Sequence, residues 1–152
     1  MRLHVVAVGR LKTGPHADLA RHYAERLKWP LSIREVEERR KLSPAELTER
    51  EAALLISAVP PGALVVALDE QGTPLTSDGF AQRLQRWRSE GVGDVAFLIG
   101  GADGLSVAVR EKAALRLSLG AMTWPHLLVR GMLLEQLYRA QQILAGHPYH
   151  RS

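Results

Sequence analysis

The chain has 152 residues, of which 46% are hydrophobic and 24% charged, with a formal net charge of +4. These values fit one soluble domain and favour a nucleic-acid partner only modestly. The absence of cysteine excludes disulfides, thiolate metal ligands and cysteine nucleophiles. No apolar run approaches the roughly 18 residues of a membrane span, and the start lacks a signal peptide, so we expect a cytoplasmic protein with no membrane partner.

Four buried strands and a short fifth are predicted in chain order. Near-continuous apolar runs at 3–9, 63–70 and 94–101 are typical of strands that are covered on both faces. Residues 31–38 alternate, as a half-exposed strand does, and 115–119 is a candidate for a short fifth strand.

Helical patterns separate these strands. Ser43 begins a capping box with proline at the first helical position, which predicts a helix to about Ala58. Ser77 or Asp78 caps a third helix, and Ser106 a short one. The apolar stripes of the other helices are Leu19, Tyr23 and Leu27 in the first, Phe80, Leu84 and Trp87 in the third, and Leu133, Leu137, Ala140 and Leu144 in the last. The alternation predicts one α/β domain with a mostly parallel sheet and helices on both faces, in which ligands bind at the carboxyl ends of the strands.

The loop after the first strand, "GRLKTGPH", does not bind a nucleotide in either standard way. Gly9 and Gly14 have the spacing of a phosphate loop, but Pro15 and His16 replace its lysine and hydroxyl residue. Leu11 replaces the middle glycine of a dinucleotide fingerprint. An NTPase or a standard nicotinamide enzyme is therefore unexpected.

Three other strand ends together describe a pocket for an adenosine-like ligand. Asp69 and Glu70 end the third strand and can bind a ribose, act as a base, or be surface acids before a turn at Gly72. The paired glycines of "IGGADGLS" let a ligand approach the backbone. "GAMTWPH" is small and apolar, and its Thr123 can cap the last helix. Taken alone, "IGGADGLS" and "GAMTWPH" are better explained by ordinary turn and connection chemistry, and the two acids equally well by a surface position.

The chain ends on "AGHPYHRS", a dense cluster of reactive groups where most chains fray. His147 and His150 are three positions apart, which raises the alternative of a metal site. Without a nearby cysteine or carboxylate cluster this alternative is weak.

The segments "VVALDEQGTPLTS", "LIGGADGLS" and "LSLGAMTWPHLLVRGMLLEQLYRAQQILAGHPYHRS", with the opening "LHVVAVGRLK", resemble one family over the whole chain. It is the SPOUT-class bacterial ribosomal RNA methyltransferases that methylate N3 of a pseudouridine in helix 69 of 23S rRNA, in the assembled ribosome. The resemblance implies S-adenosylmethionine as cofactor and a homodimer whose site is completed by both subunits. It also implies a single domain, 1–152, with a trefoil knot in roughly 63–152, which no general rule would predict.

The resemblance also assigns roles to residues. The cofactor is expected to contact Leu68, Gly100, Gly101, Gly120, Ala121, Met122, Thr123, Trp124 and Pro125. The tail is expected to lie over the pocket of the partner subunit. There His150 serves as the base or orients it, Tyr149 stacks on the target base, and Arg151 binds phosphate or a developing carbonyl anion.

Four residues of the last helix are further candidates. His126 and Arg130 are expected to contact RNA or cofactor, although a cap-region role suits His126 equally well. Glu135 and Arg139, four apart, either orient the tail or form an ordinary surface ion pair. Arg130 also belongs to the expected RNA-binding side chains, so that its loss should weaken ribosome binding. The others are Arg2, Arg10 and Lys12.

Some positions depart from the family pattern. Asp103 stands where glutamate is usual, Trp124 is bulky for a cofactor loop, Gly131 replaces a β-branched residue, and 39–42 looks shortened. Two alternatives remain open from the sequence. One is a non-enzymatic RNA-binding protein that no longer holds the cofactor, and the other is methylation of a different RNA.

Overall fold

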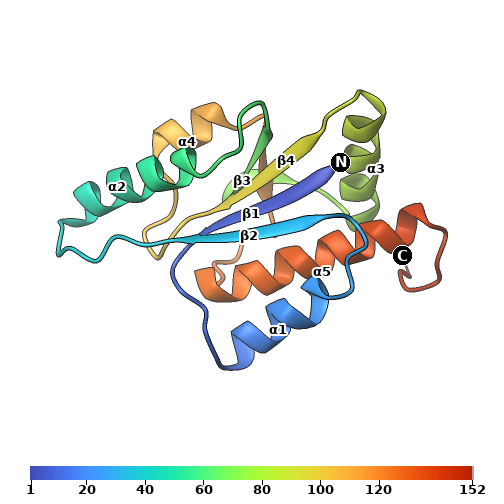
Figure 1. Cartoon of the computed structure of the whole chain (residues 1–152), viewed down its shortest axis with the longest axis horizontal. Helices are drawn as coiled ribbons and strands as arrows, with labels where there is room; N and C mark the ends of the chain where they lie inside the picture. The colour runs from blue at the N-terminus through green and yellow to red at the C-terminus, as the bar shows by residue number, and fades with distance from the viewer. Residues whose placement is uncertain (152) are drawn as a thin grey trace.

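The computed structural model, which describes residues 1–151, has five strands in one entirely parallel sheet of order β2-β1-β4-β3-β5. Helices cover both faces of the sheet (Figure 1), which confirms the predicted fold class. The elements are β1 (Arg2–Val8), α1 (Pro15–Ala24), β2 (Leu31–Val36), α2 (Pro44–Ser57), β3 (Leu64–Pro74), α3 (Ser77–Ser89), β4 (Asp94–Ile99), α4 (Val107–Lys112), β5 (Leu115–Ser118) and α5 (His126–Leu144).

The apolar runs of the strands are explained by burial on both faces. Successive side chains of a strand point to opposite faces. Leu3 and Val5 of β1 belong to the core shared with α1, α3 and α5, whereas Val6 and Val8 belong to the core shared with α2 and α4. The strand β2 lies at an edge of the sheet and is largely exposed, which accounts for its alternating sequence.

The predicted helix starts are partly confirmed. The Ser43 hydroxyl accepts a hydrogen bond from the Glu46 N–H at 3.2 Å and the reciprocal bond is present, so the predicted capping box is confirmed. The predicted caps of α3 are wrong: its cap is Thr76, whose hydroxyl accepts from the Gly79 N–H at 2.9 Å. In α1, Leu27 lies beyond the end of the helix and still packs against the core, so the periodic pattern overstated the helix length.

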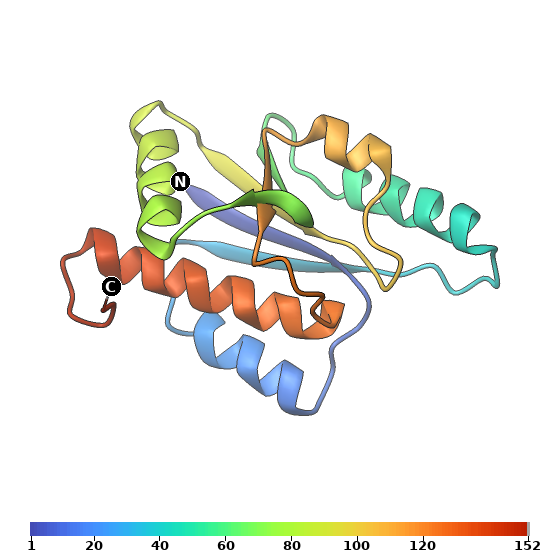
Figure 2. The ribbon, with the colours of Figure 1, turned by 180° about the vertical axis from the view of Figure 1, so that it is seen from behind.

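The predicted turn at Gly72 is wrong, because β3 continues to Pro74 through a bulge. Leu68 and Thr73 both align with Leu117 of β5, and the residues between them are pushed out of the ladder. A Cβ on Gly72 would lie 2.4 Å from the Arg116 carbonyl oxygen, so only glycine fits. Figure 2 shows β3 curving across β5, with the connection from β5 to α5 beside it.

The longest helix, α5, crosses one face of the sheet from the carboxyl ends of the strands to the opposite edge (Figure 1). It packs against α1 at Gly131, where a Cβ would lie 2.8 Å from Leu19 Cδ2 and 2.9 Å from its Cγ. The departure of Gly131 from the family pattern therefore matches a close approach to Leu19. Within residues 1–151, no helix is long and apolar enough to span a membrane.

We predict that Gly131→Val lowers the free energy of unfolding by about 1–3 kcal/mol, because the added side chain overpacks the contact with Leu19. Urea denaturation measures the change. The loss should shrink in a Leu19→Ala background, where space is available. Gly93→Val is the control, since nothing lies within 4 Å of the position of its Cβ. An equal loss with and without Leu19 would contradict the packing explanation.

Candidate functional site

A cavity of about 310 Å³ lies at the carboxyl ends of β3, β4 and β5, the edge at which a parallel sheet binds ligands. Its lining combines all three strand-end loops that the sequence identified. The sequence-predicted residues that line it are Leu68, Gly100, Gly101, Gly120, Met122, Thr123, Trp124 and His126. Ala121 and Pro125 belong to the same connection between β5 and α5 but do not line the cavity.

The loop after β4 folds back over the end of its strand and leaves backbone facing the cavity. The Gly104 N–H donates to the Gly101 carbonyl at 3.0 Å, and Gly104 has φ +80°. A Cβ on Gly100 would lie 2.7 Å from the Gly104 carbonyl oxygen. A Cβ on Gly101 would lie 3.0 Å from both carboxyl oxygens of Glu51. Both Cβ positions point at protein atoms, so close packing requires glycine at these two residues, which line the cavity with their backbone.

The loop after β5 is tied to the bulge of β3. The Thr123 hydroxyl donates to the Glu70 carboxylate at 3.0 Å, and the Ser118 hydroxyl donates to the Glu70 carbonyl at 3.0 Å. The predicted capping role of Thr123 is wrong, because α5 begins after Pro125 without a side-chain cap. Two walls of the cavity are therefore held together by hydrogen bonds around Glu70.

Two large apolar side chains stand uncovered on the rim of the cavity. Met122 is 73% exposed and Trp124 is 41% exposed. Exposed apolar groups of this size beside a cavity are typical of a surface that another molecule covers.

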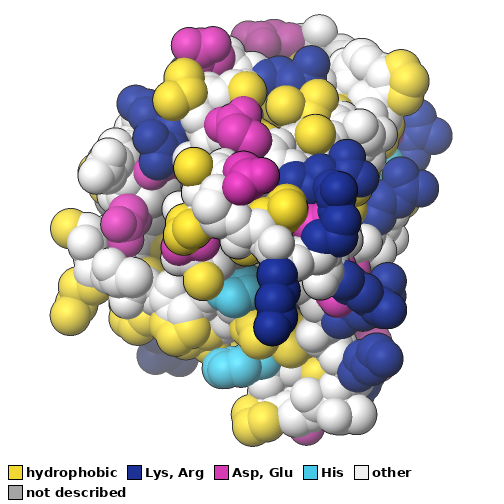
Figure 3. Space-filling model, turned by 90° about the vertical axis from the view of Figure 1, so that its left-hand side faces the viewer, with side chains coloured by type: hydrophobic (Ala, Val, Ile, Leu, Met, Phe, Trp, Pro, Cys, Tyr) yellow, Lys and Arg dark blue, Asp and Glu magenta, His cyan; other side chains and the backbone are white. Residues whose placement is uncertain are grey.

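The cavity is surrounded by charged groups. Figure 3 shows the face at the carboxyl ends of the strands, where Lys and Arg side chains gather along one side with acidic side chains beside them. Burial and the nearby Asp103 raise the pKa of the Glu51 carboxyl, and one of its oxygens has no hydrogen-bond partner among the described residues. Burial and the nearby Arg130 lower the pKa of His126, which favours a neutral imidazole at the cavity wall.

The tail is held against α5 by a compact polar cluster. The Tyr149 hydroxyl donates to Glu135 at 3.1 Å, and Arg139 donates to the same carboxylate at 2.6 Å. The Arg139 guanidinium also lies over the Tyr149 ring, 4.8 Å from its centroid. Contact of Glu135 and Arg139 with the tail is thus present within one chain.

Both ring nitrogens of His150 have partners. Nδ1 lies 3.1 Å from Nη1 of Arg139, and Nε2 lies 3.3 Å from the Asp78 carboxylate. Because a guanidinium only donates, Nδ1 accepts and Nε2 carries the proton toward Asp78. From the sequence, Asp78 is expected only as a helix cap, because no local pattern links it to the tail.

The alternative of a metal site at the two tail histidines finds no support in these contacts. The His147 Nδ1 accepts from the Tyr149 N–H at 3.1 Å, while His150 contacts Arg139 and Asp78. Across residues 1–151, no group of three or more His, Cys, Asp or Glu side chains could hold a metal ion.

The tail and the cavity lie at opposite ends of the molecule. His126 lines the cavity at the start of α5, and the tail follows the end of this helix (Figure 1). The tail folds back onto Glu135 and Arg139, which lie about 14 and 20 Å beyond His126 at 1.5 Å per residue, and no described tail residue lines the cavity. Tyr149, His150 and the exposed Arg151 therefore do not meet the predicted cofactor residues of their own chain.

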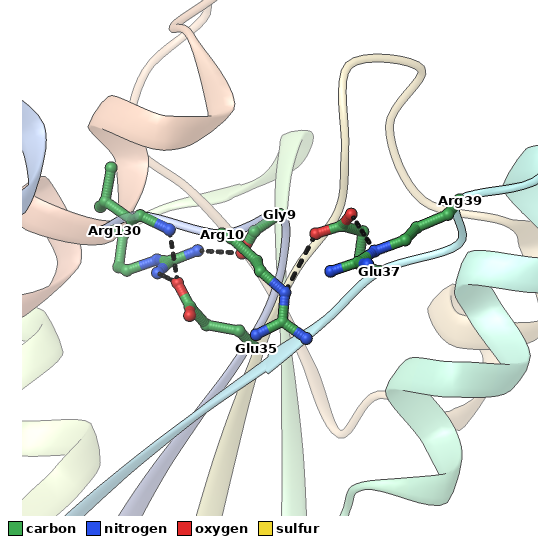
Figure 4. A network of polar contacts seen from close by, with 7 residues as sticks. Gly9, Arg10, Glu35, Glu37, Arg39 and Arg130 are labelled. Carbon is green, nitrogen blue, oxygen red and sulfur yellow. Dashed lines mark hydrogen bonds and ion pairs between the residues drawn. The ribbon is translucent and has the colours of Figure 1, made fainter. Parts of the chain in front are cut away.

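Arg130 is buried, with 3% of its surface exposed, and this overturns the expectation that it contacts RNA directly. Its guanidinium donates to the Glu35 carboxylate at 2.5 Å and to the Gly9 carbonyl at 3.1 Å (Figure 4). Glu35 also accepts from the Leu11 N–H at 2.7 Å. The network joins α5 to β2 and to the loop after β1. No local sequence pattern predicts this network, because Glu35 and Arg130 are 95 positions apart.

The other basic residues expected to contact RNA separate into two groups. Arg2 lies at the start of β1 and pairs with Asp94 at 3.0 Å, at the edge opposite the cavity. Arg10 follows the carboxyl end of β1 and pairs with Glu37, which also holds Arg39 (Figure 4). Arg10 and the neighbouring Lys12 therefore lie at the same edge of the sheet as the cavity.

Comparison with known proteins gives one consistent result. A family described as "Predicted SPOUT methyltransferase" matches residues 1–150. The protein is similar to the ribosomal RNA large subunit methyltransferase H of Rhodospirillum centenum, with 59% identity over 152 residues and 100% of both chains covered. The enzyme of the same name from Paramagnetospirillum magneticum is 58% identical over 151 residues, with 99% of each chain covered.

Two solved structures share the fold at low identity. The putative methyltransferase Lpg2936 from Legionella pneumophila, in complex with SAM, has a TM-score of 0.51 at 13% identity, with 92% of this chain and 66% of that chain covered. The SpoU methyltransferase AviRb from Streptomyces viridochromogenes, in complex with AdoMet, has a TM-score of 0.50 at 18% identity, with 93% and 58% covered.

We predict that Gly100→Ala abolishes measurable binding of S-adenosylmethionine, because the new Cβ collides with the backbone of Gly104 and must displace the loop. Titration calorimetry gives the affinity. Gly93 directly precedes β4, and no atom lies within 4 Å of the position of its Cβ. The control variant Gly93→Ala should therefore bind the cofactor as the wild type does. Wild-type affinity of Gly100→Ala would show that this loop is not a cofactor wall.

We predict that Arg130→Met lowers the free energy of unfolding at neutral pH by about 2–3 kcal/mol, because Glu35 loses its buried partner. Burial alone would raise the pKa of Glu35, but hydrogen bonds from Arg130 and the Leu11 N–H lower it below the usual 4.5. A carboxyl whose pKa is lowered in the folded state stabilises the fold at pH values above its usual pKa. This stabilisation is lost as the pH falls through the lowered pKa. Urea denaturation at several pH values should therefore show the difference from wild type shrinking in acid.

The control for this experiment is Arg39→Met, whose side chain is 73% exposed and pairs with Glu37. It should change stability by no more than about 0.5 kcal/mol. If Arg130→Met is as stable as the wild type but loses ribosome binding, then Arg130 does contact RNA directly.

Proposed function

The chain belongs to the SPOUT methyltransferases, and from this premise we propose that it methylates N3 of a pseudouridine in helix 69 of 23S rRNA, with S-adenosylmethionine as cofactor. The substrate is the assembled ribosome, which places the protein in the cytoplasm. High identity over the full length to enzymes named for the large subunit RNA supports the substrate class. The cavity formed by three strand-end loops is the observation that carries the proposal.

The residues at the cavity fit the proposed cofactor. Gly100 and Gly101 leave backbone accessible at one wall, and the apolar Met122 and Trp124 line another, as a flat adenosine requires. The hydrogen bond from Thr123 to Glu70 holds the walls at a fixed separation. When bound, S-adenosylmethionine supplies an electrophilic methyl group.

The active site is completed by a second copy of the chain. The tail folds back along α5 only as far as Glu135 and Arg139, about 14 and 20 Å beyond His126, and no described tail residue lines the cavity of its own chain. A two-fold dimer with antiparallel α5 helices brings the tail of each subunit to the cavity of the other. Such a dimer also covers the exposed Met122 and Trp124, which supports this arrangement.

In this arrangement the tail aligns the target base and removes its N3 proton. Alignment of the nitrogen with the methyl group is an effective-concentration effect. In the free chain Arg139 occupies Nδ1 of His150. A phosphate or carbonyl of the arriving RNA draws Arg139 away, which leaves Nδ1 free to accept the proton. Tyr149 stacks on the base, and the exposed Arg151 binds phosphate or the developing carbonyl anion.

The proposal includes a single domain, 1–152, and a knot within roughly 63–152. The strand order is consistent with it: β4 lies between β1 and β3, and the next strand, β5, returns to the far side of β3. The family match over residues 1–150 supports the single domain.

We predict that the wild-type protein transfers labelled methyl groups to ribosomes that lack this modification, and that His150→Ala lowers the rate at least about 100-fold, as expected for a lost base. Mass spectrometry of RNA fragments locates the methyl group. His147→Ala is the matched control and should retain most activity. Methyl transfer to a different RNA would identify that RNA as the substrate. Cofactor binding without any transfer to these ribosomes would favour a target that the assay lacks. No cofactor binding would favour the non-enzymatic alternative.

We predict that two inactive variants restore activity to each other. Mixed dimers of His150→Ala and Gly100→Ala contain one site with an intact tail and an intact cavity. Coexpression in equal amounts should therefore give about a quarter of wild-type activity, since half of the dimers are mixed and each has one working site. Methyl transfer by the purified mixture is the measurement. No activity beyond that of the single variants would place each complete site within one subunit.

A further inference from the structure

Arg110 is the only lysine or arginine among the residues that line the cavity. It lies in the last turn of α4, and its side chain is 37% exposed. The Arg110 Nε is buried and forms no hydrogen bond with the described residues, although it lies within ion-pair distance of Asp69. Because the side chain is partly exposed and lines the cavity, a group that enters the cavity can contact its guanidinium.

Asp69 holds Arg110 in place without neutralising it fully. Its carboxylate is buried, with 4% of the side chain exposed, and lies 3.4 Å from Nε of Arg110. The same oxygen lies 3.5 Å from Arg116, and the other oxygen accepts from the Gln71 N–H. One carboxylate thus serves two guanidinium groups, and the cluster retains a net positive charge. Arg116 does not line the cavity, so Arg110 presents this charge to a ligand.

The remaining charged groups at the cavity are acidic. Glu70 and Asp103 line it, and the nearby His126 has a lowered pKa. An anionic group of a ligand therefore has one favourable place, beside Arg110, and cationic groups have two, beside Glu70 and Asp103. The methionine end of S-adenosylmethionine carries one carboxylate together with an ammonium and a sulfonium group, which matches this distribution.

We propose that Arg110 binds the α-carboxylate of the cofactor through its guanidinium and so makes the cavity select ligands that carry the amino-acid end. The inference rests on the proposed function, because it takes S-adenosylmethionine as the ligand. Arg110 is a specificity-determining residue in this account. A guanidinium presents several donors in a fixed plane, which suits a carboxylate.

The test compares two analogues that have an uncharged thioether in place of the sulfonium, by calorimetry on the purified protein. S-adenosylhomocysteine has the carboxylate, and 5′-methylthioadenosine lacks the whole amino-acid end. Arg110→Gln should weaken S-adenosylhomocysteine about tenfold or more and leave 5′-methylthioadenosine unchanged, as expected for one lost charged hydrogen bond. Arg110→Lys should give a smaller loss. Arg116→Gln, which removes the other partner of Asp69, should weaken S-adenosylhomocysteine less than Arg110→Gln does and leave 5′-methylthioadenosine unchanged.

Several results would overturn the inference. Equal weakening of both ligands by Arg110→Gln would mean that Arg110 only supports the fold of α4. Unchanged S-adenosylhomocysteine affinity together with weaker ribosome binding would make Arg110 a phosphate contact. Failure of the wild type to bind either ligand would remove the cofactor from the proposed function as well, so the two failures are distinguishable.

Discussion

The straight, buried course of α5 is the constraint on which the site depends. Leu133, Leu134 and Leu137 are fully buried against the sheet, so the helix cannot bend or shift without opening the core. It therefore fixes the distance between a cavity at its first turn and a reactive tail beyond its last. Under the proposed function neither half performs the chemistry alone, and two copies in opposite directions would bring the halves together. The proposed dimer is thus the arrangement that this geometry requires for catalysis.

Polar contacts fix α5 near its start and hold the tail against its second half. At the first turns, Arg130 is buried with Glu35 and the Gly9 carbonyl, which fixes the helix against the loop after β1 (Figure 4). At the last turns, Glu135 and Arg139 hold Tyr149 and His150 in defined positions. These contacts hold the tail in place, and under the proposed function this reduces the conformational entropy that RNA binding must remove. The buried Arg130–Glu35 pair adds little net stability as a pair, whereas removal of one partner alone is costly.

Much of the fold could be predicted from local sequence, and the exceptions have a common cause. The apolar strands, the Ser43 cap and the loops of the cavity are encoded by neighbouring residues. The bulge at Gly72, the bond from Thr123 to Glu70 and the burial of Arg130 depend on partners far along the chain. A lone arginine or threonine carries no local sign of such a partner. The roles of the tail came from the family resemblance, because spacing alone equally allowed a metal site.

The most direct measurement of the shared site is cross-linking between subunits, which the absence of native cysteine makes clean. Met122→Cys and His147→Cys are introduced into separate, differently tagged chains, which are coexpressed and treated with a short bis-maleimide. The account predicts a covalent mixed dimer that joins position 122 of one chain to position 147 of the other. Each single variant alone should give much less covalent dimer. Failure of the mixed sample to cross-link would contradict a site built from the cavity of one subunit and the tail of its partner.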